Sequence, residues 1–238
     1  MYLNLSKNKI KAVAIFTQEE MFPNLKWLDV SSNKLTELPG FKLPKLEYLD
    51  ISNMNIEKIN DGWAGHANLR VFKCFANKFK SLAQFKAMPK CEELYASNNQ
   101  ITVITGWEGL PIIKKLHLRR NKIEKVDEEL APSETLEYLN LRANKIAGMD
   151  QIERLYKNPL LTDINVLNNP VESNASSFNV LLAEVLAKNP KVKRFCKHDV
   201  QESNLLEAVF YKQYKWGKAE EARKKQLAEE KAKAAAED

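Results

Sequence analysis

The stretch Leu136-Glu-Tyr-Leu-Asn-Leu-Arg-Ala-Asn-Lys-Ile146 follows the pattern L-x-x-L-x-L-x-x-N-x-I. Its Leu139-Asn-Leu141 core predicts a short strand, because alternate side chains of a strand share one face and both leucines then point inward. The amide of Asn144 can satisfy backbone groups where the chain turns inward after the strand. One such unit cannot bury its own apolar face, so neighbouring units must stack on it.

The same frame recurs through most of the chain, at intervals of 21 to 25 residues. The asparagine position falls at Asn8, Asn33, Met54, Asn77, Asn99, Asn121, Asn144 and Asn169. At the exception, Met54, we expect Asn53 or Asn55 to turn the coil instead. Period and pattern are those of leucine-rich repeats. The sequence therefore predicts an α/β solenoid: a leucine-rich repeat horseshoe with a concave parallel sheet, a helical C-terminal cap and a projecting C-terminal helix.

The repeat frame also fixes where strands and helices are expected. Strands are predicted at residues 28–30, 49–51, 72–74, 94–96, 116–118, 139–141 and 164–166, with return segments too short for long helices. A short helix is expected at residues 153–157. Apolar residues at helical spacing, introduced by serines, predict a cap helix over residues 178–186. Asn189-Pro190 ends it, and Val192 and Phe195 supply a last strand-like edge.

The chain is expected to divide into a repeat domain with its cap (residues 1–200) and a C-terminal helical tail (residues 201–238). Ser203 or Asn204 should cap a helix that begins at Leu205, and Gly217 should interrupt it. One face of this helix carries apolar residues at i, i+3, i+4 and i+8. We expect this face to dock on a neighbouring subunit, and the alternative is that it folds back on the cap. The predicted binding residues of the tail are Leu206, Val209, Phe210, Tyr214 and Trp216.

Composition narrows the class of protein. The chain of 238 residues is 44% hydrophobic, enough for a sizeable core, and no apolar run approaches the length of a membrane span. Cys74, Cys91 and Cys196 do not form a paired framework, so we expect a reducing, intracellular compartment, and Cys74 and Cys91 are expected to be buried thiols. The first coil begins directly on its strand, so further chain upstream or another chain is expected to cover that end.

The net charge of +6 raises nucleic acid as a partner. Residues 201–238 hold eight basic and eight acidic side chains, so the excess lies in the repeats. The two signs are interleaved there, and no aromatic RNA-binding motif is present, so a protein partner is favoured over nucleic acid.

No catalytic constellation is visible in the sequence. His66, His117 and His198 are far apart in the repeat frame and lack Cys or carboxylate partners at ligand or triad spacing. We expect isolated histidines on a solvated surface, no metal, no cofactor and no enzymatic activity.

The frame identifies the outward positions of the concave face, which include many aromatic and basic residues: Tyr2, Trp27, Tyr48, Phe75, Tyr95, His117, Arg119, Tyr138 and Arg142, with Lys73, Lys115 and Arg120 nearby. A continuous patch of this kind is typical of a protein-binding surface, and Trp, Tyr and Arg are enriched at interface hot spots. The alternative is a solvated sheet whose aromatics stabilise one another across strands.

Three motifs of the C-terminal third resemble a known family. They are Thr135-Leu-Glu-Tyr-Leu-Asn-Leu-Arg-Ala-Asn-Lys-Ile146, Asn168-Asn-Pro170, and Asn189-Pro-Lys-Val-Lys-Arg-Phe195 followed by a Lys/Glu-rich helix. Together they look like the family of leucine-rich-repeat-containing protein twenty-three, the ciliary leucine-rich repeat proteins of the radial spokes. The resemblance implies a structural protein of the axoneme, in the head region of the third radial spoke, with radial-spoke subunits as partners and a place in the ciliary cytoskeleton. The repeats and cap equally suit a phosphatase-regulating adaptor, an axonemal dynein light chain or a spliceosomal repeat protein.

Overall fold

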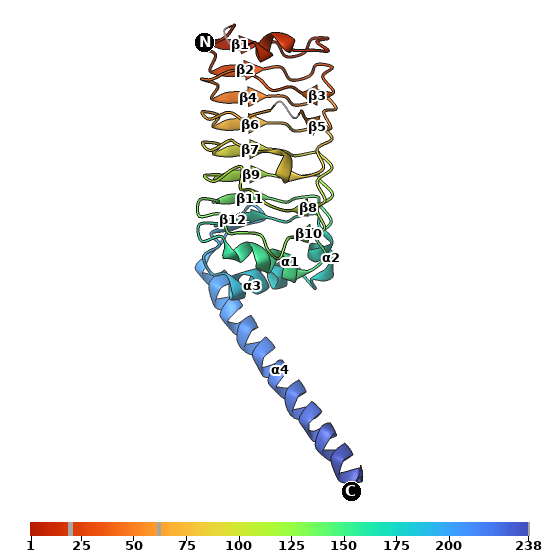
Figure 1. The fold of residues 1–238 in the computed structure, drawn as a ribbon. Helices are drawn as coiled ribbons and strands as arrows, with labels where there is room; N and C mark the ends of the chain where they lie inside the picture. The colour runs from red at the N-terminus through yellow and green to blue at the C-terminus, as the bar shows by residue number, and fades with distance from the viewer. Residues whose placement is uncertain (19–20, 61–62, 238) are drawn as a thin grey trace.

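The computed structural model describes residues 1–18, 21–60 and 63–237, and it is a solenoid of stacked coils with a long helix at its C-terminal end (Figure 1). The described residues form a ten-stranded main sheet in the order β1-β2-β4-β6-β7-β9-β11-β12-β13-β14. Its strands are β1 (Tyr2–Asn4), β2 (Trp27–Asp29), β4 (Tyr48–Asp50), β6 (Val71–Lys73), β7 (Glu93–Tyr95), β9 (Lys115–His117), β11 (Tyr138–Asn140), β12 (Asp163–Asn165), β13 (Arg194–Phe195) and β14 (His198–Asp199). All neighbours pair in parallel except β13 and β14, which are antiparallel. The predicted parallel sheet is confirmed.

Each predicted strand lies one residue too far along the chain. The strand predicted at residues 28–30, for example, is β2 at Trp27–Asp29. Strand β2 begins one residue before Leu28, because Trp27 already pairs in register with Tyr48 of β4. Pairing also continues just beyond β2, because the Val30 N–H donates to the Asp50 carbonyl (2.9 Å). The shift is therefore within the usual one- or two-residue uncertainty of element ends.

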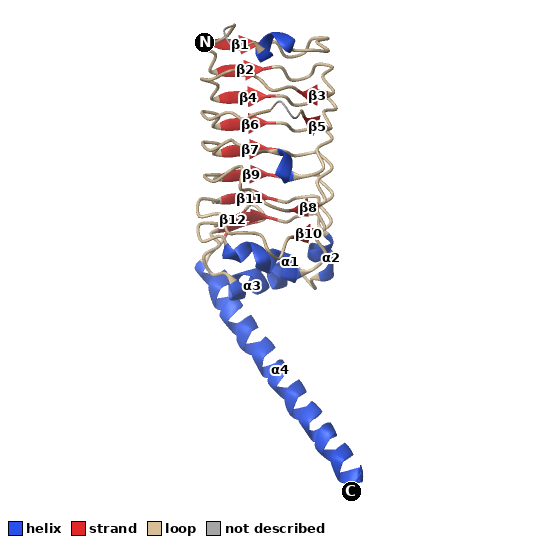
Figure 2. Cartoon of the chain, in the orientation of Figure 1, coloured by secondary structure: helices blue, strands red, loops and turns tan. Residues whose placement is uncertain are grey.

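The return side of the solenoid is more regular than expected. Two small parallel sheets lie there, β3 (Glu37–Leu38) with β5 (Lys58–Ile59), and β8 (Val103–Ile104) with β10 (Lys125–Val126) (Figure 2). Two short 3₁₀ helices, η1 (Ala14–Thr17) and η2 (Leu82–Gln84), complete other coils. The sequence analysis predicted irregular or 3₁₀ returns but not these paired strands.

A continuous apolar core fills the solenoid. The central residue of each inner strand of the main sheet is fully buried, as in Leu28, Leu49, Phe72 and Leu94. The buried apolar residues form one cluster from Val13 to the C-terminal cap. Stacking thus buries the face that a single repeat would leave exposed.

A ladder of buried asparagines closes the turn after the strand in most coils. In the coil of Asn99, the side-chain Nδ2 donates to the carbonyls of Cys74 and Ala96 (both 3.0 Å), and Oδ1 accepts from the Phe79 N–H (3.0 Å). The same three-way pattern recurs at Asn33, Asn77, Asn121, Asn144 and Asn169. The predicted role of the asparagine is confirmed.

Met54 interrupts this ladder without breaking the coil. Its side chain points inward and is only 2% exposed, whereas Asn53 and Asn55 are exposed. Asn53 has φ 58°, the same left-handed conformation that precedes the asparagine in the other coils, and Asn55 adds a second at φ 68°. The chain therefore turns here through backbone conformation, which Asn tolerates better than most residues.

Helices close the C-terminal end of the solenoid. They are α1 (Met149–Glu153) with the 3₁₀ helix η3 (Arg154–Lys157), α2 (Pro170–Asn174) and α3 (Phe178–Lys188). In α3, the Ser177 hydroxyl accepts from the Val180 N–H (3.3 Å) as its N-cap, and β13 follows as the last parallel strand. The cap helix and the final strand are as predicted, while α2 and the β14 edge were not anticipated.

Helix α4 (Glu202–Glu237) begins on the cap and then extends away from it (Figure 1). Two predictions about it are wrong. The helix begins at Glu202 rather than Leu205, and it runs without a break through Gly217. The strong helix formers that follow Gly217 outweigh the roughly 1 kcal/mol that one interior glycine costs.

Candidate protein-binding site

The concave face is the outward face of the main sheet. On each strand the first and third residues point outward and flank the buried central residue. Strand register aligns them from coil to coil, so that Tyr2, Trp27 and Tyr48 follow one another across β1, β2 and β4. The predicted residues Phe75, Arg119 and Arg142 lie just after their strands and are half-buried.

Aromatic rings stack along the N-terminal half of this face. The Tyr2 and Trp27 ring centroids are 6.2 Å apart. Trp27 and Tyr48 are 4.9 Å apart and nearly parallel, with planes at 12°. Offset stacking of this kind is worth about 0.5–1.5 kcal/mol per pair. It also fixes the rings as a rigid surface.

Lys73 joins this stack to a second one. Its Nζ lies 5.1 Å from the Tyr48 ring centroid and 5.3 Å from that of Tyr95. Tyr95 stacks on His117 at 4.3 Å, and His117 meets Tyr138 at 4.8 Å. We call the whole row, from Tyr2 through Lys73 to Tyr138, the aromatic column. The sequence predicted the rings at one strand spacing, but not the cation–π bridge that makes the row continuous.

Carboxylates border the aromatic column. Asp29 and Asp50 are in register on β2 and β4, and burial, aided by the negative charge of Asp29, raises the pKa of Asp50. Farther along, Glu93 accepts from the Tyr95 hydroxyl (2.7 Å) and pairs with Lys115 (2.9 Å). These two contacts lower the pKa of Glu93, and burial with the bond to Glu93 raises the pKa of Tyr95 to about 12. The tyrosine therefore stays a neutral donor.

The predicted residues of the tail form a second exposed surface. Leu206, Val209, Phe210, Tyr214 and Trp216 are between 53% and 70% exposed. At 100° per residue, they share the face of α4 that points away from the cap. We call them the apolar stripe of α4.

The opposite face of α4 rests on the cap. Ala208 is 3% exposed and belongs to the core cluster. Tyr211 and Lys215 follow on the same side at i+3 and i+7, and the pKa of Lys215 is raised by its bond to Tyr211 and by Glu184 of α3. The helix thus packs through a small and polar side and presents its apolar side to solvent, the reverse of an ordinary surface helix.

The expectation of solvated histidines is wrong for two of the three. His66 is 5% exposed against Trp63 (4.7 Å between centroids), and burial lowers its pKa to about 4. His117 lies within the aromatic column, where burial lowers its pKa. Both are therefore neutral packing rings at physiological pH. His198 is exposed and lies 5.0 Å from the Phe178 ring.

All three thiols are buried, as predicted for Cys74 and Cys91. Burial raises the pKa of Cys91 and of Cys196 to about 12, and it also raises the pKa of Cys74 well above its ordinary value. Such thiols are poor nucleophiles. In the described ranges, no group of three His, Cys, Asp or Glu side chains is placed to hold a metal ion.

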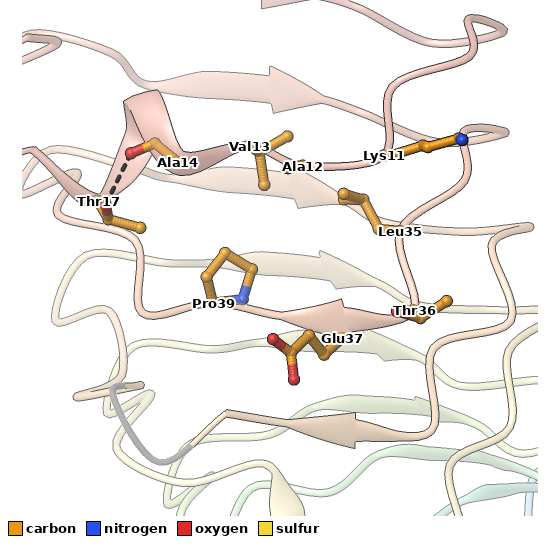
Figure 3. A pocket seen from close by; sticks show the side chains of 9 residues that line it. All are labelled: Lys11, Ala12, Val13, Ala14, Thr17, Leu35, Thr36, Glu37 and Pro39. Carbon is orange, nitrogen blue, oxygen red and sulfur yellow. Dashed lines mark hydrogen bonds between the residues drawn. The ribbon is translucent and has the colours of Figure 1, made fainter.

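A hollow of about 270 Å³ lies between the return segments of the first two coils (Figure 3). Its lining includes the apolar residues Val13 and Leu35 and the charged residues Lys11 and Glu37. Thr17 is engaged locally, its hydroxyl donating to the Ala14 carbonyl (2.6 Å). The lining residues do not include a nucleophile beside a general base, so we interpret the hollow as a surface depression and not as a catalytic site.

These features define a leucine-rich repeat protein whose surface carries the aromatic column on the main sheet and the apolar stripe on α4. None of the described helices has both the length and the apolar composition that crossing a bilayer requires.

Comparison with known proteins agrees with this class. The family model described as "Leucine Rich repeats (2 copies)" matches residues 23–65. The chain is similar to leucine-rich repeat-containing protein 23 of Homo sapiens (25% identity, 90% of this chain, 60% of the relative) and of Bos taurus (24%, 87% and 58%). It therefore spans about three fifths of the length of these curated relatives. Among solved structures, an internalin of Listeria monocytogenes superposes with a TM-score of 0.60 at 22% identity, over 74% of this chain and 52% of that one, which shows the fold alone.

Proposed function

We propose that this chain is a non-catalytic scaffold of the ciliary axoneme, a radial-spoke component of the head region of the third spoke, that holds neighbouring subunits through its concave face and α4. The homologues named leucine-rich repeat-containing protein 23 support this proposal. So does the resemblance of the C-terminal motifs to the ciliary radial-spoke family.

The observation that carries the proposal is that the two exposed surfaces are separate. The aromatic column lies on β1 to β11, whereas the apolar stripe faces away from the cap on α4. Contiguous apolar patches on a protein surface often mark protein contacts. One chain can therefore hold two neighbours at once, as a permanent scaffold must.

A soluble adaptor that regulates an enzyme such as a protein phosphatase is the alternative, and an axonemal dynein light chain is another. Fractionation of ciliated cells expressing the tagged chain distinguishes the adaptor from the scaffold. A scaffold stays with axonemes through detergent and salt extraction, whereas an adaptor washes out with detergent. Release by detergent would contradict the proposal.

Two sets of variants assign the surfaces. Replacing Trp27, Tyr48 and Tyr95 with Ala should remove one contact, and replacing Val209 and Phe210 with Ala the other. Each set should lower retention in salt-extracted axonemes while leaving the circular dichroism spectrum unchanged. The matched control changes the exposed polar residues Glu207 and Lys212 of α4 to Ala and should be retained normally. Normal retention of both test sets would move the interface to another surface.

A further inference from the structure

Two arginines of the concave face lie side by side. Arg119 and Arg142 occupy the same position, two residues after β9 and β11, and the register His117↔Asn140 places them on neighbouring rungs, about 4.8 Å apart along the sheet. The next residue holds the two segments together, since the Arg120 N–H donates to the Arg142 carbonyl (2.9 Å). Both side chains are half-buried.

Neither guanidinium is satisfied within the described part of the chain. The Nε atoms of Arg119 and Arg142 are both buried without a hydrogen-bond acceptor. No described carboxylate pairs with either, although other basic groups of this face are paired, Lys115 with Glu93 (2.9 Å) and Arg194 with Asp163 (3.3 Å). A buried donor without an acceptor costs about 1–3 kcal/mol, and two neighbouring like charges add repulsion. The pair is thus arranged to receive an anionic group.

The surroundings favour carboxylates over phosphates. A guanidinium presents a planar fork of donors that matches a carboxylate in a bidentate contact. A polyphosphate chain running along the face would meet the negative charges of Glu93, Asp163 and Asp50, whereas a short flexible peptide can place one or two carboxylates at the arginines and turn its other side chains toward solvent. The adjoining column of Tyr95, His117 and Tyr138 offers rings for the rest of such a peptide.

We infer that Arg119 and Arg142 are the anchor of the concave face for an extended acidic segment of a partner protein, whose carboxylates they bind through paired guanidinium contacts. This inference deepens the proposed function and rests on its claim that the concave face binds protein. Since rungs repeat at about 4.8 Å and an extended chain rises about 3.3 Å per residue, acidic residues about one or two positions apart fit the two arginines.

The test uses the full purified chain, labelled with ¹⁵N at arginine, and a hexaglutamate peptide as the probe. Titration in 150 mM salt should shift the Nε–H signals of Arg119 and Arg142 and saturate. The double variant Arg119→Gln/Arg142→Gln should lose at least about tenfold in affinity, equivalent to 1.4 kcal/mol. The matched control is Arg120→Gln, which changes the exposed neighbouring arginine and should alter affinity less than about twofold.

Further variants distinguish the effect of charge from the effect of guanidinium geometry and from a loss of folding. Arg119→Lys/Arg142→Lys keeps the charge but loses the fork, and should bind hexaglutamate several-fold more weakly than the unaltered chain. The Gln double variant should melt at the same temperature or higher, because it removes an uncompensated pair. Equal hexaglutamate binding by the Gln variant and the unaltered chain would overturn the inference. Tighter binding of inorganic phosphate or of a single-stranded oligonucleotide than of hexaglutamate would overturn it too.

The experiments distinguish a failure of the arginine anchor from a failure of the proposed scaffold function. Hexaglutamate binding is measured on the isolated chain and does not depend on cilia. If the peptide binds at the arginines but the chain washes out of axonemes with detergent, only the scaffold role is lost. If the chain is retained but the arginine signals do not shift, only the anchor is lost.

Discussion

Replacing Asn121 with Ala removes three buried hydrogen bonds. The loss in the free energy of unfolding depends on whether each partner group keeps another hydrogen bond. The side-chain Nδ2 donates to the carbonyls of Ala96 (3.0 Å) and Leu118 (2.9 Å), and Oδ1 accepts from the Ile101 N–H (3.1 Å). Each carbonyl keeps a second donor, the amide of the adjacent ladder asparagine. Only the Ile101 N–H is left without its partner.

The free energy of unfolding should therefore fall by about 2–6 kcal/mol. The orphaned N–H contributes about 1–3 kcal/mol, and each of the two other lost bonds about 0.5–1.5 kcal/mol. Urea denaturation measures the change, with the slope of the transition expected to stay constant. The matched control is Asn8→Ala at the exposed end of the ladder, where the amide serves only Leu5 and Ser6 and no neighbouring N–H. A loss below about 0.5 kcal/mol for Asn121→Ala would refute the ladder as a source of stability.

Three further predictions concern other buried or interior positions. Burial lowers the pKa of His66 to about 4 in the folded chain, against 6.5 for an exposed histidine. As the pH falls, the unfolded chain therefore takes up this proton before the folded chain does. The free energy of unfolding should consequently fall by about 3 kcal/mol between about pH 6.5 and pH 4. His66→Phe should remove that part of the pH dependence, and an identical pH profile would contradict it. Gly217→Ala should raise the helicity of a peptide spanning residues 202–237, because nothing lies within 4 Å of the added Cβ and alanine favours helix by about 1 kcal/mol. In the full chain, the same substitution should leave the melting temperature of the solenoid unchanged. A weaker negative ellipticity of the variant peptide at 222 nm would contradict the prediction. Cys74, Cys91 and Cys196 should resist the thiol reagent DTNB at pH 8 until denaturant is added, and rapid labelling of the folded chain would show that a thiol is accessible.

The repeat itself was predictable because its pattern is local. Leucine positions and Asn144-type residues recur in one frame, so the parallel sheet, the asparagine turns and the outward residues all follow from spacing alone. The cap helix was predictable for the same reason, since its serine N-cap and its apolar spacing lie within one short segment. These features need no knowledge of what packs against them.

What the sequence did not reveal depends on contacts between coils. His66 packs against Phe41 of the preceding coil as well as against nearby Trp63, and no local pattern shows the contact with Phe41. Lys73 bridges two rings that lie one strand away on either side. The side of α4 that meets the cap was hidden because a small residue, Ala208, makes the contact while the larger apolar residues face away.

Helix α4 also sets a distance. Its 36 residues span about 54 Å at 1.5 Å per residue, whereas the nine steps between the ten strands of the main sheet amount to about 43 Å. About 30 Å of this rod lies beyond Trp216, past the part that rests on the cap. The chain consequently reaches well beyond the end of its solenoid (Figure 1). A protein bound at the far end of α4 would be held at a fixed distance from a protein bound to the main sheet.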